Sequence, residues 1–390
     1  MLRKHRDLLI SVVVGVLLVS GAKGQQPLND ADSKRIAHLL DTDRSPDLLQ
    51  CTIQPVKPML DFAFRLDVGY IVTCPSLQFE GHASNVAIFA RVTPEGGKPL
   101  MLGQGYDLFV VPAKSSIHQD NIQMSGGFAA GEGKYQVEVL VGDKETGRTS
   151  RKSWSVRVKR SHQQRAEQVA IPPGTIFPLG VRPWPIKTDT TGKGLRVTVL
   201  LNAAPASPWV TRLRAWDRTF LVESLSSLLK QIPCASVRLR AFNLQQQVEL
   251  FRQDQFDDAG FTKLEDALEK LELGTISYQA LQQRRRWLDM LMGYAREELI
   301  AATPSDVVIF LGPWRYFGGE IPRDQIPTHE TPEPRFYYFE YFPYWLRSHP
   351  PDALGTLTKG LDGTIYEMNS PADLVHSVQK MLAKVENRNK

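Results

Sequence analysis

The residues of this chain that could do chemistry form no catalytic motif in the sequence. Eight histidines occur, and none stands in an H-E-x-x-H or another metal-ligand spacing. There is no G-x-S-x-G elbow and no Walker loop, and Lys193 comes before a predicted strand, so it cannot cradle a phosphate in the usual way. Glu340 lies among aromatic residues, as in a sugar site, but glycoside hydrolysis requires a pair of carboxylates. We therefore expect a protein without catalytic activity, with a cell-envelope hydrolase acting through Glu340 as the alternative.

The three cysteines do not have the spacing of a redox or zinc site. Cys51 and Cys74 could form a disulfide that connects the segment 25–55 to the first domain. Cys234 would then be unpaired. Free thiols at all three positions are the open alternative.

The first residues have the pattern of an export signal. Basic residues at 3–6 precede an apolar run, Leu8–Val19, and the small residues Ala22 and Gly24 follow it. The run is too short to span a bilayer comfortably. We predict a signal peptide over 1–24, cleaved after Gly24, and a periplasmic or secreted, cell-surface protein. The alternative is that the signal is not cleaved and anchors the chain in the membrane. We expect no other contact with a membrane.

The composition is that of an ordinary globular protein, with 390 residues, 42% hydrophobic and 23% charged. This length allows two domains with connecting segments. The net charge of +5 is mild, and basic residues alternate with acidic ones along the chain. We therefore expect no nucleic-acid partner.

Hydrophobic patterning divides the rest of the chain into four parts. Residues 25–55 are polar and read as a linker or arm, and residues 161–190 form a linker rich in proline and glycine. Between them, 56–160 shows short runs of period two, which predict an all-β sandwich. The segment 131–137 resembles the corner before a late strand of immunoglobulin-like domains, where the hydroxyl of a tyrosine, here Tyr135, bonds to the upstream backbone.

Residues 191–390 alternate predicted strands with predicted helices. Leu195–Pro208 reads as a buried central strand that runs into a loop, and Val307–Leu311 as a second central strand. Thr262 and Glu265 have the spacing of a capping box at the start of a helix. The pattern predicts an α/β fold with a doubly wound, Rossmann-like, mostly parallel sheet.

Two segments of this second half resemble von Willebrand factor A (vWA) domains. Residues 363–374, GTIYEMNSPADL, are similar to the last strand and helix start of that family, and 260–268, GFTKLEDAL, to its middle G-x-T segment. With a sandwich in front, the chain resembles the secreted vWA-related proteins of acidobacteria. The resemblance implies a vWA-like domain over 191–390 after an immunoglobulin-like sandwich.

Most members of the vWA family hold a divalent cation in a metal-ion-dependent adhesion site. Its ligands come from a D-x-S-x-S motif, a middle threonine and an aspartate after the fourth strand. The corresponding positions of this chain are Asn202, Ala204, Ala206, Thr262 and Pro313. Because hard cations require oxygen ligands, carboxylates foremost, we interpret the site as degenerate and predict no metal and no cofactor.

Aromatic residues dominate the loops that would follow the first, fourth and fifth strands of the sheet. The candidate binding residues are Asn202, Trp209, Trp314, Arg315, Tyr316, Tyr344 and Trp345. Aromatic and arginine side chains dominate binding hot spots, so these loops predict an interaction with another protein of the cell envelope or surface. A glycan bound by the same loops is the second hypothesis, and aromatic side chains that only pack beneath long loops are the third.

Overall fold

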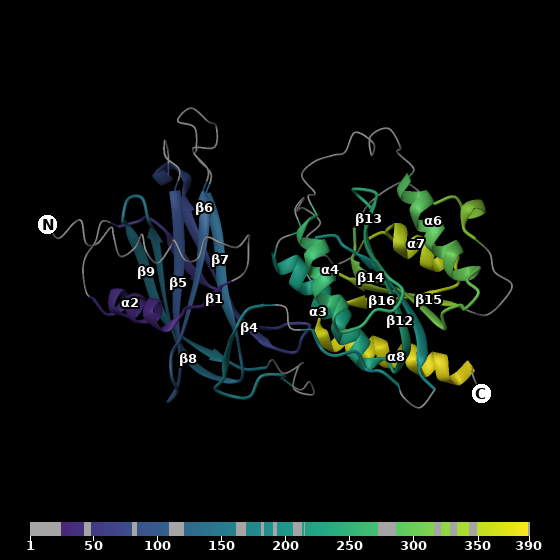
Figure 1. The fold of residues 1–390 in the computed structure, drawn as a ribbon, viewed down its shortest axis with the longest axis horizontal. Coiled ribbons are helices and arrows are strands. Elements are labelled where there is room, and N and C mark those ends of the chain that lie inside the picture. Colours follow the sequence, from purple (N-terminus) through teal and green to yellow (C-terminus); the bar gives the residue numbers. More distant parts are fainter. Residues whose placement is uncertain are drawn as a thin grey trace. The chain divides into compact units, whose positions relative to one another are not determined.

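The structure, a computed structural model, describes residues 25–42, 48–79, 84–108, 121–160, 169–180, 183–189, 193–205, 213, 215–271, 286–315, 321–327, 334–342 and 349–388. The chain forms two compact units, Met1–Gly180 and Val181–Lys390 (Figure 1). The predicted signal peptide lies outside the described residues. None of the helices described is long and apolar enough to cross a membrane.

The first unit consists of two antiparallel sheets. The order of one is β1-β6-β5-β8-β9, and that of the other is β10-β7-β4-β2, with β3 paired to β4. The strands are β1 (Gln26–Pro27), β2 (Thr52–Pro55), β3 (Met59–Leu60), β4 (Leu66–Pro75), β5 (Ser84–Pro94), β6 (Leu100–Leu108), β7 (Asn121–Ala130), β8 (Gly133–Asp143), β9 (Thr149–Val158) and β10 (Ile176–Pro178), with a 3-10 turn at Ser76–Phe79.

Alternate side chains of both sheets form one hydrophobic core. Val68 and Val72 of β4 belong to the same buried cluster as Val86 of β5 and Val137 of β8. This is the packing expected of strands with one buried face. The expected corner bond is present, because the Tyr135 hydroxyl donates to Gly131 O at 2.8 Å.

The segment 25–55, predicted to be a linker or arm, is instead part of the first unit. It supplies one strand to each sheet, β1 and β2, and helix α2 (Asp30–Asp41) between them. Asn29 caps this helix by accepting a hydrogen bond from the backbone of Asp32. Ile36 and Leu40 of the helix pack against β5, β6 and β8. Cys51 and Cys74 form a disulfide that connects β2 with β4.

The second unit contains a six-stranded sheet of order β13-β12-β11-β14-β15-β16. The strands are β11 (Leu195–Asn202), β12 (Cys234–Asn243), β13 (Val248–Gln253), β14 (Val307–Pro313), β15 (Arg335–Tyr341) and β16 (Thr364–Met368). The helices are α3 (Ala215–Gln231), α4 (Gly260–Glu269), α6 (Arg286–Leu299), α7 (Ala353–Gly360) and α8 (Pro371–Arg388), with a 3-10 turn at Arg323–Gln325.

The predicted fold class, a doubly wound and mostly parallel α/β sheet, is wrong for this chain. The described strands form three sheets, and nine of their pairs are antiparallel whereas four are parallel. Two sheets are wholly antiparallel, and the edge strand β13 adds an antiparallel pair to the third. The prediction placed the parallel sheet at 191–390 after an all-β sandwich at 56–160, and it did not anticipate the antiparallel pairs made by β1, β2 and β10.

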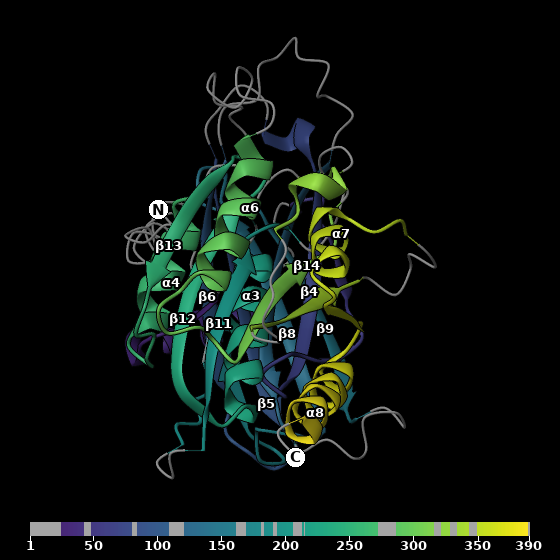
Figure 2. The same ribbon diagram turned by 90° about the vertical axis from the view of Figure 1, so that its right-hand side faces the viewer.

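The helices pack against both faces of the third sheet (Figure 2). Buried residues of α6 and α7 form one cluster with Phe310 of β14 and with Phe336 and Tyr338 of β15. On the opposite face, the ring of Phe220 of α3 packs at a tilt against that of Tyr341, and α3 also contacts α8. We call the face covered by α6 and α7 the α7 face. The side chains at even positions of β15, such as Phe336 and Tyr338, point to it.

One predicted helix boundary is wrong. Helix α4 begins at Gly260, so Thr262 lies inside the helix, and the N-cap residue Ala259 makes no side-chain capping bond. The Asp257 carboxylate instead accepts from the backbone N–H of Gly260 at 2.9 Å. The hydrophobic pattern also predicts a helix over 277–300. Residues 277–285 lie outside the described residues, and Arg286–Leu299 forms helix α6.

The cysteines generate a first prediction. Cys234 is buried, and burial raises the pKa of its thiol to about 12, so little thiolate forms near neutral pH. At pH 8 the native chain should therefore have no thiol that reacts with a disulfide reagent. The denatured chain should have one reactive thiol, and the denatured and reduced chain should have three. Two or more reactive thiols before reduction would contradict the Cys51–Cys74 disulfide.

Candidate functional site

Three loops leave the third sheet from neighbouring strand ends. The first residues of these loops are hydrogen bonded to the next strand: Ala203 N donates to Phe242 O at 2.7 Å, Trp314 N to Tyr341 O at 2.9 Å, and Phe342 N to Met368 O at 3.0 Å. The loops that follow β11, β14 and β15 therefore start side by side at the carboxyl edge of the sheet. In parallel sheets this is the edge where ligands bind.

Two of the predicted degenerate metal positions meet at this edge. Asn202 is 2% exposed, and its side-chain N–H donates to Pro313 O at 3.4 Å, whereas its Oδ1 has no partner in the part of the chain that the structure describes. Gly312 lies beside it with φ +152°, and a Cβ there would come within 2.7 Å of Asn202 O, so the backbone approach requires glycine.

The other degenerate positions do not complete a cation site. Ala204 is buried and carries no ligand atom, and Thr262 is exposed on α4. Ala206 lies outside the described residues. Asn202 thus offers the one side-chain oxygen that the described positions bring to this edge.

Trp314 packs into the base of its loop. Its side chain is 8% exposed, its Nε1 donates to Pro350 O at 3.0 Å, and its ring packs against those of Phe342 and His349. Trp314 therefore packs beneath its loop, with its ring buried. Arg315 is half-buried, and its backbone N–H donates to Asp352 Oδ2 at 3.3 Å. The other candidates, Trp209, Tyr316, Tyr344 and Trp345, lie outside the described residues.

Asp352 connects three parts of this edge. Its Oδ1 accepts from Gly355 N at 2.8 Å and so caps helix α7, and its Oδ2 accepts from the Tyr338 hydroxyl at 2.9 Å as well as from Arg315 N. Burial raises the pKa of Asp352, and these hydrogen bonds oppose that rise. The carboxylate fixes the end of the loop that leads from β15 to α7.

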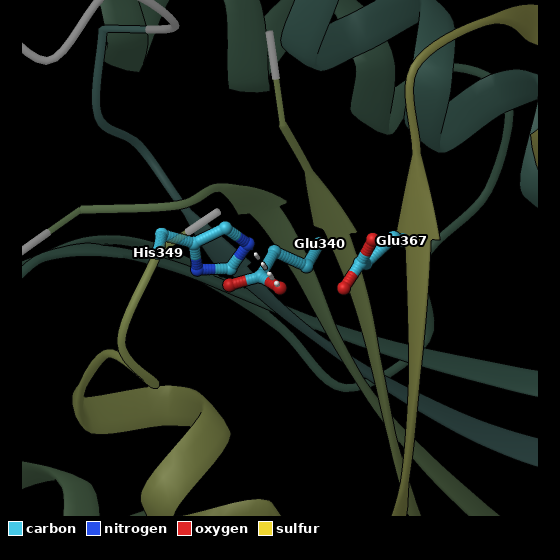
Figure 3. Close-up of side chains that lie close together, drawn as sticks. All are labelled: Glu340, His349 and Glu367. Atoms are coloured by element: carbon cyan, nitrogen blue, oxygen red, sulfur yellow. Dashed lines mark ion pairs between the residues drawn. The ribbon is translucent and has the colours of Figure 1, made fainter. Parts of the chain in front are cut away.

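Next to Asp352 the structure brings together Glu340, His349 and Glu367, which sequence patterns had not grouped. Glu340 and Glu367 are register partners on the parallel strands β15 and β16, so their side chains lie on the same, α7 face. His349 comes from the loop before α7, and its Nε2 lies 3.7 Å from Glu340 Oε2. Figure 3 shows Glu340 between the other two. One ligand atom from each residue lies within 4.8 Å of the others.

The carboxyl group of Glu340 is in an unfavourable place for a charge. The residue is 3% exposed, and no hydrogen bond from the described residues reaches it. Burial raises its pKa to about 8, and the charges of Asp352 and Glu367 add to that effect, whereas Lys359 opposes it. The site is therefore acidic, with Glu340 buried and Glu367 exposed to solvent.

His349 is held by aromatic side chains and by one backbone oxygen. The centre of its ring is 3.9 Å from that of Phe342 and 5.0 Å from that of Trp314. Its Nδ1 lies 3.1 Å from Pro350 O. Because a carbonyl oxygen only accepts, this bond requires the hydrogen on Nδ1, and Nε2 is then left with a free electron pair toward Glu340.

Sequence reasoning missed this cluster because it treated Glu340 as a lone carboxylate and judged histidines by local spacing. A usable signal was present. Glu340 and Glu367 each stand at the carboxyl end of a predicted strand, and such ends meet when parallel strands are neighbours. The position of His349 carried no signal, because sequence patterns do not show which strand end a loop residue approaches.

Comparisons with known proteins give only weak likenesses. No family model and no curated protein matches the chain. Among solved structures, the ArnB paralog VWA2 of Sulfolobus acidocaldarius is 10% identical, with a TM-score of 0.27 over 64% of this chain and 50% of that one. A family 123 glycoside hydrolase of Clostridium perfringens is 8% identical, with a TM-score of 0.23 over 82% of this chain and 72% of that one.

A Bacteroides uniformis β-glucuronidase is 9% identical, with a TM-score of 0.20 over 82% of this chain and 45% of its own length. This chain thus spans half or less of two of these three structures. TM-scores of this size do not establish a shared fold, and we assign neither fold nor activity from them.

Trp314 should stabilise the loop bases. Trp314→Ala removes a buried indole and should lower the free energy of unfolding by about 3–5 kcal/mol. Trp314→Phe keeps a ring but loses the bond to Pro350 O, at a cost of about 1 kcal/mol. Urea unfolding followed by circular dichroism measures both, and an unchanged midpoint for Trp314→Ala would contradict the packing of its ring against Phe342 and His349.

The raised pKa of Glu340 predicts a pH-dependent stability. Between about pH 4.5 and 8 the folded chain retains a proton that the unfolded chain releases, so this group lowers stability as pH rises through that window. Glu340→Gln removes the effect. In EDTA, its melting temperature relative to wild type should be higher at pH 9 than at pH 5.

The exposed Glu386→Gln on α8 is the matched control for losing one carboxylate. A difference between Glu340→Gln and wild type that does not change with pH, or that grows toward acid, contradicts the prediction.

Proposed function

We propose that this chain is an exported, non-catalytic protein that binds another protein of the cell envelope or surface through the loops after β11, β14 and β15. The single observation that supports this proposal most is the adjacency of the three loop bases. Their first residues are hydrogen bonded from strand to strand, so the loops rise from one edge of the sheet. Loops carried by a rigid scaffold are a common form of binding surface.

The composition of these loops favours a protein partner. Beyond their buried bases, the loops carry Trp209, Tyr316, Tyr344 and Trp345. Tyrosine and tryptophan bury a large area and still offer a polar group, and for this reason they dominate interface hot spots. The packing of Trp314 and Phe342 beneath the loops would reduce the conformational freedom lost on binding.

Export is supported by two independent features of the first unit. The N-terminal residues have the pattern of a signal peptide. Cys51 and Cys74 form a disulfide, and structural disulfides persist mainly in oxidising compartments such as the periplasm and the cell surface.

Site-specific photo-crosslinking tests the proposal. A photoreactive phenylalanine analogue at Tyr344, in cells that produce the protein, should give one discrete adduct with an envelope protein. The matched control is the same analogue at Ile300, which is 81% exposed and lies at the other end of the sheet, before β14. Equal adducts at both positions, or none at Tyr344, would contradict the proposed binding surface.

A glycan array distinguishes the second hypothesis. Binding of the purified chain to one class of glycan, abolished by Trp345→Ala, would replace the protein partner with a carbohydrate.

A further inference from the structure

Glu340, His349 and Glu367 present the ligand atoms of a metal centre. Two carboxylates and one imidazole form a mixed oxygen and nitrogen set, and their ligand atoms lie within 4.8 Å of one another. Ligands bound about 2 Å from one tetrahedral ion are roughly 3.3 Å apart. The 3.7 Å between His349 Nε2 and Glu340 Oε2 is near that separation and too long for a hydrogen bond.

The surroundings of His349 are those of a metal ligand. Histidines that bind metals almost always donate their other ring N–H to a carboxylate, a backbone carbonyl or a water. Here Nδ1 contacts Pro350 O at 3.1 Å, which leaves Nε2 free to bind an ion on the side of Glu340. The ring is only 10% exposed and is flanked by Phe342 and Trp314, so its orientation is fixed in advance.

Glu340 supplies an independent observation. Its side chain is only 4% exposed, its carboxyl group points at the centre of the cluster, and no hydrogen bond joins it to the residues that the structure describes (Figure 3). Buried carboxylates are normally paired or bind a metal. Asp352 and Glu367 make the surroundings more acidic, and the exposed Glu367 gives an ion a path from solvent.

We propose that Glu340, His349 and Glu367 bind one divalent transition-metal ion of the zinc class. Imidazole suits zinc and its neighbours in the first row, whereas Mg²⁺ and Ca²⁺ prefer oxygen ligands alone. Three protein ligands leave the fourth position of a tetrahedral ion to water. This site is distinct from the positions Asn202, Ala204, Ala206, Thr262 and Pro313, for which no metal is predicted.

Calorimetric titration with Zn²⁺ tests the proposal. The chain, purified without a histidine tag and freed of metal with EDTA, should bind one Zn²⁺. Glu340→Gln and His349→Gln should each weaken binding by at least about tenfold, since each removes a ligand. His376→Gln and Glu386→Gln, at exposed positions of α8, are the matched controls and should bind like wild type.

Co²⁺ in place of Zn²⁺ gives a second readout. A tetrahedral cobalt centre with an imidazole ligand should produce visible absorption bands, which Glu367→Gln at the exposed edge should diminish even if the buried variants do not fold. Absence of Zn²⁺ binding would overturn the proposal. So would an affinity unchanged by the substitutions, or Ca²⁺ binding that survives His349→Gln. Because no partner is needed, the result is independent of the proposed binding function.

Discussion

The parallel register of β14, β15 and β16 determines which side chains meet at the carboxyl edge of the third sheet. It aligns Gly312 with Glu340 and Glu340 with Glu367, so two carboxyl groups stand on the α7 face beside a residue without a side chain. A slip of one residue in β16 would turn Glu367 to the opposite face. Both the acidic cluster and the adjacency of the loop bases depend on this register.

Sequence patterns predicted the strands better than their assembly. The buried runs around β11 and β14 and the bond of Tyr135 were accessible, because burial and local turn chemistry act over a few residues. The strands β1 and β2 were missed, since they come from a polar segment that was interpreted as a linker. The cluster around Glu340 was missed because cross-strand register has no signature in a single strand.

Glu340 interrupts an otherwise consistent pattern. Phe336 and Tyr338 precede it on the same face of β15 and are fully buried in the hydrophobic cluster, whereas Glu340 places an ionisable group where burial opposes its charge. Chains tolerate such local conflicts mainly at functional sites. Asp352 keeps Glu340 in these surroundings, because its three hydrogen bonds hold the loop that carries His349 against the end of β15.

The Cys51–Cys74 disulfide has a consequence for the timing of folding. It joins the segment that supplies β2 to strand β4 across a sequence separation of 23, and closing a loop of that length contributes about 3 kcal/mol to stability. If the chain is exported as proposed, this bond is missing while the chain remains in the reducing cytoplasm. A newly made chain is then less stable before secretion than after it, which favours the unfolded state that translocation through a narrow channel requires. The covalent link forms only when the chain has reached the compartment where it works.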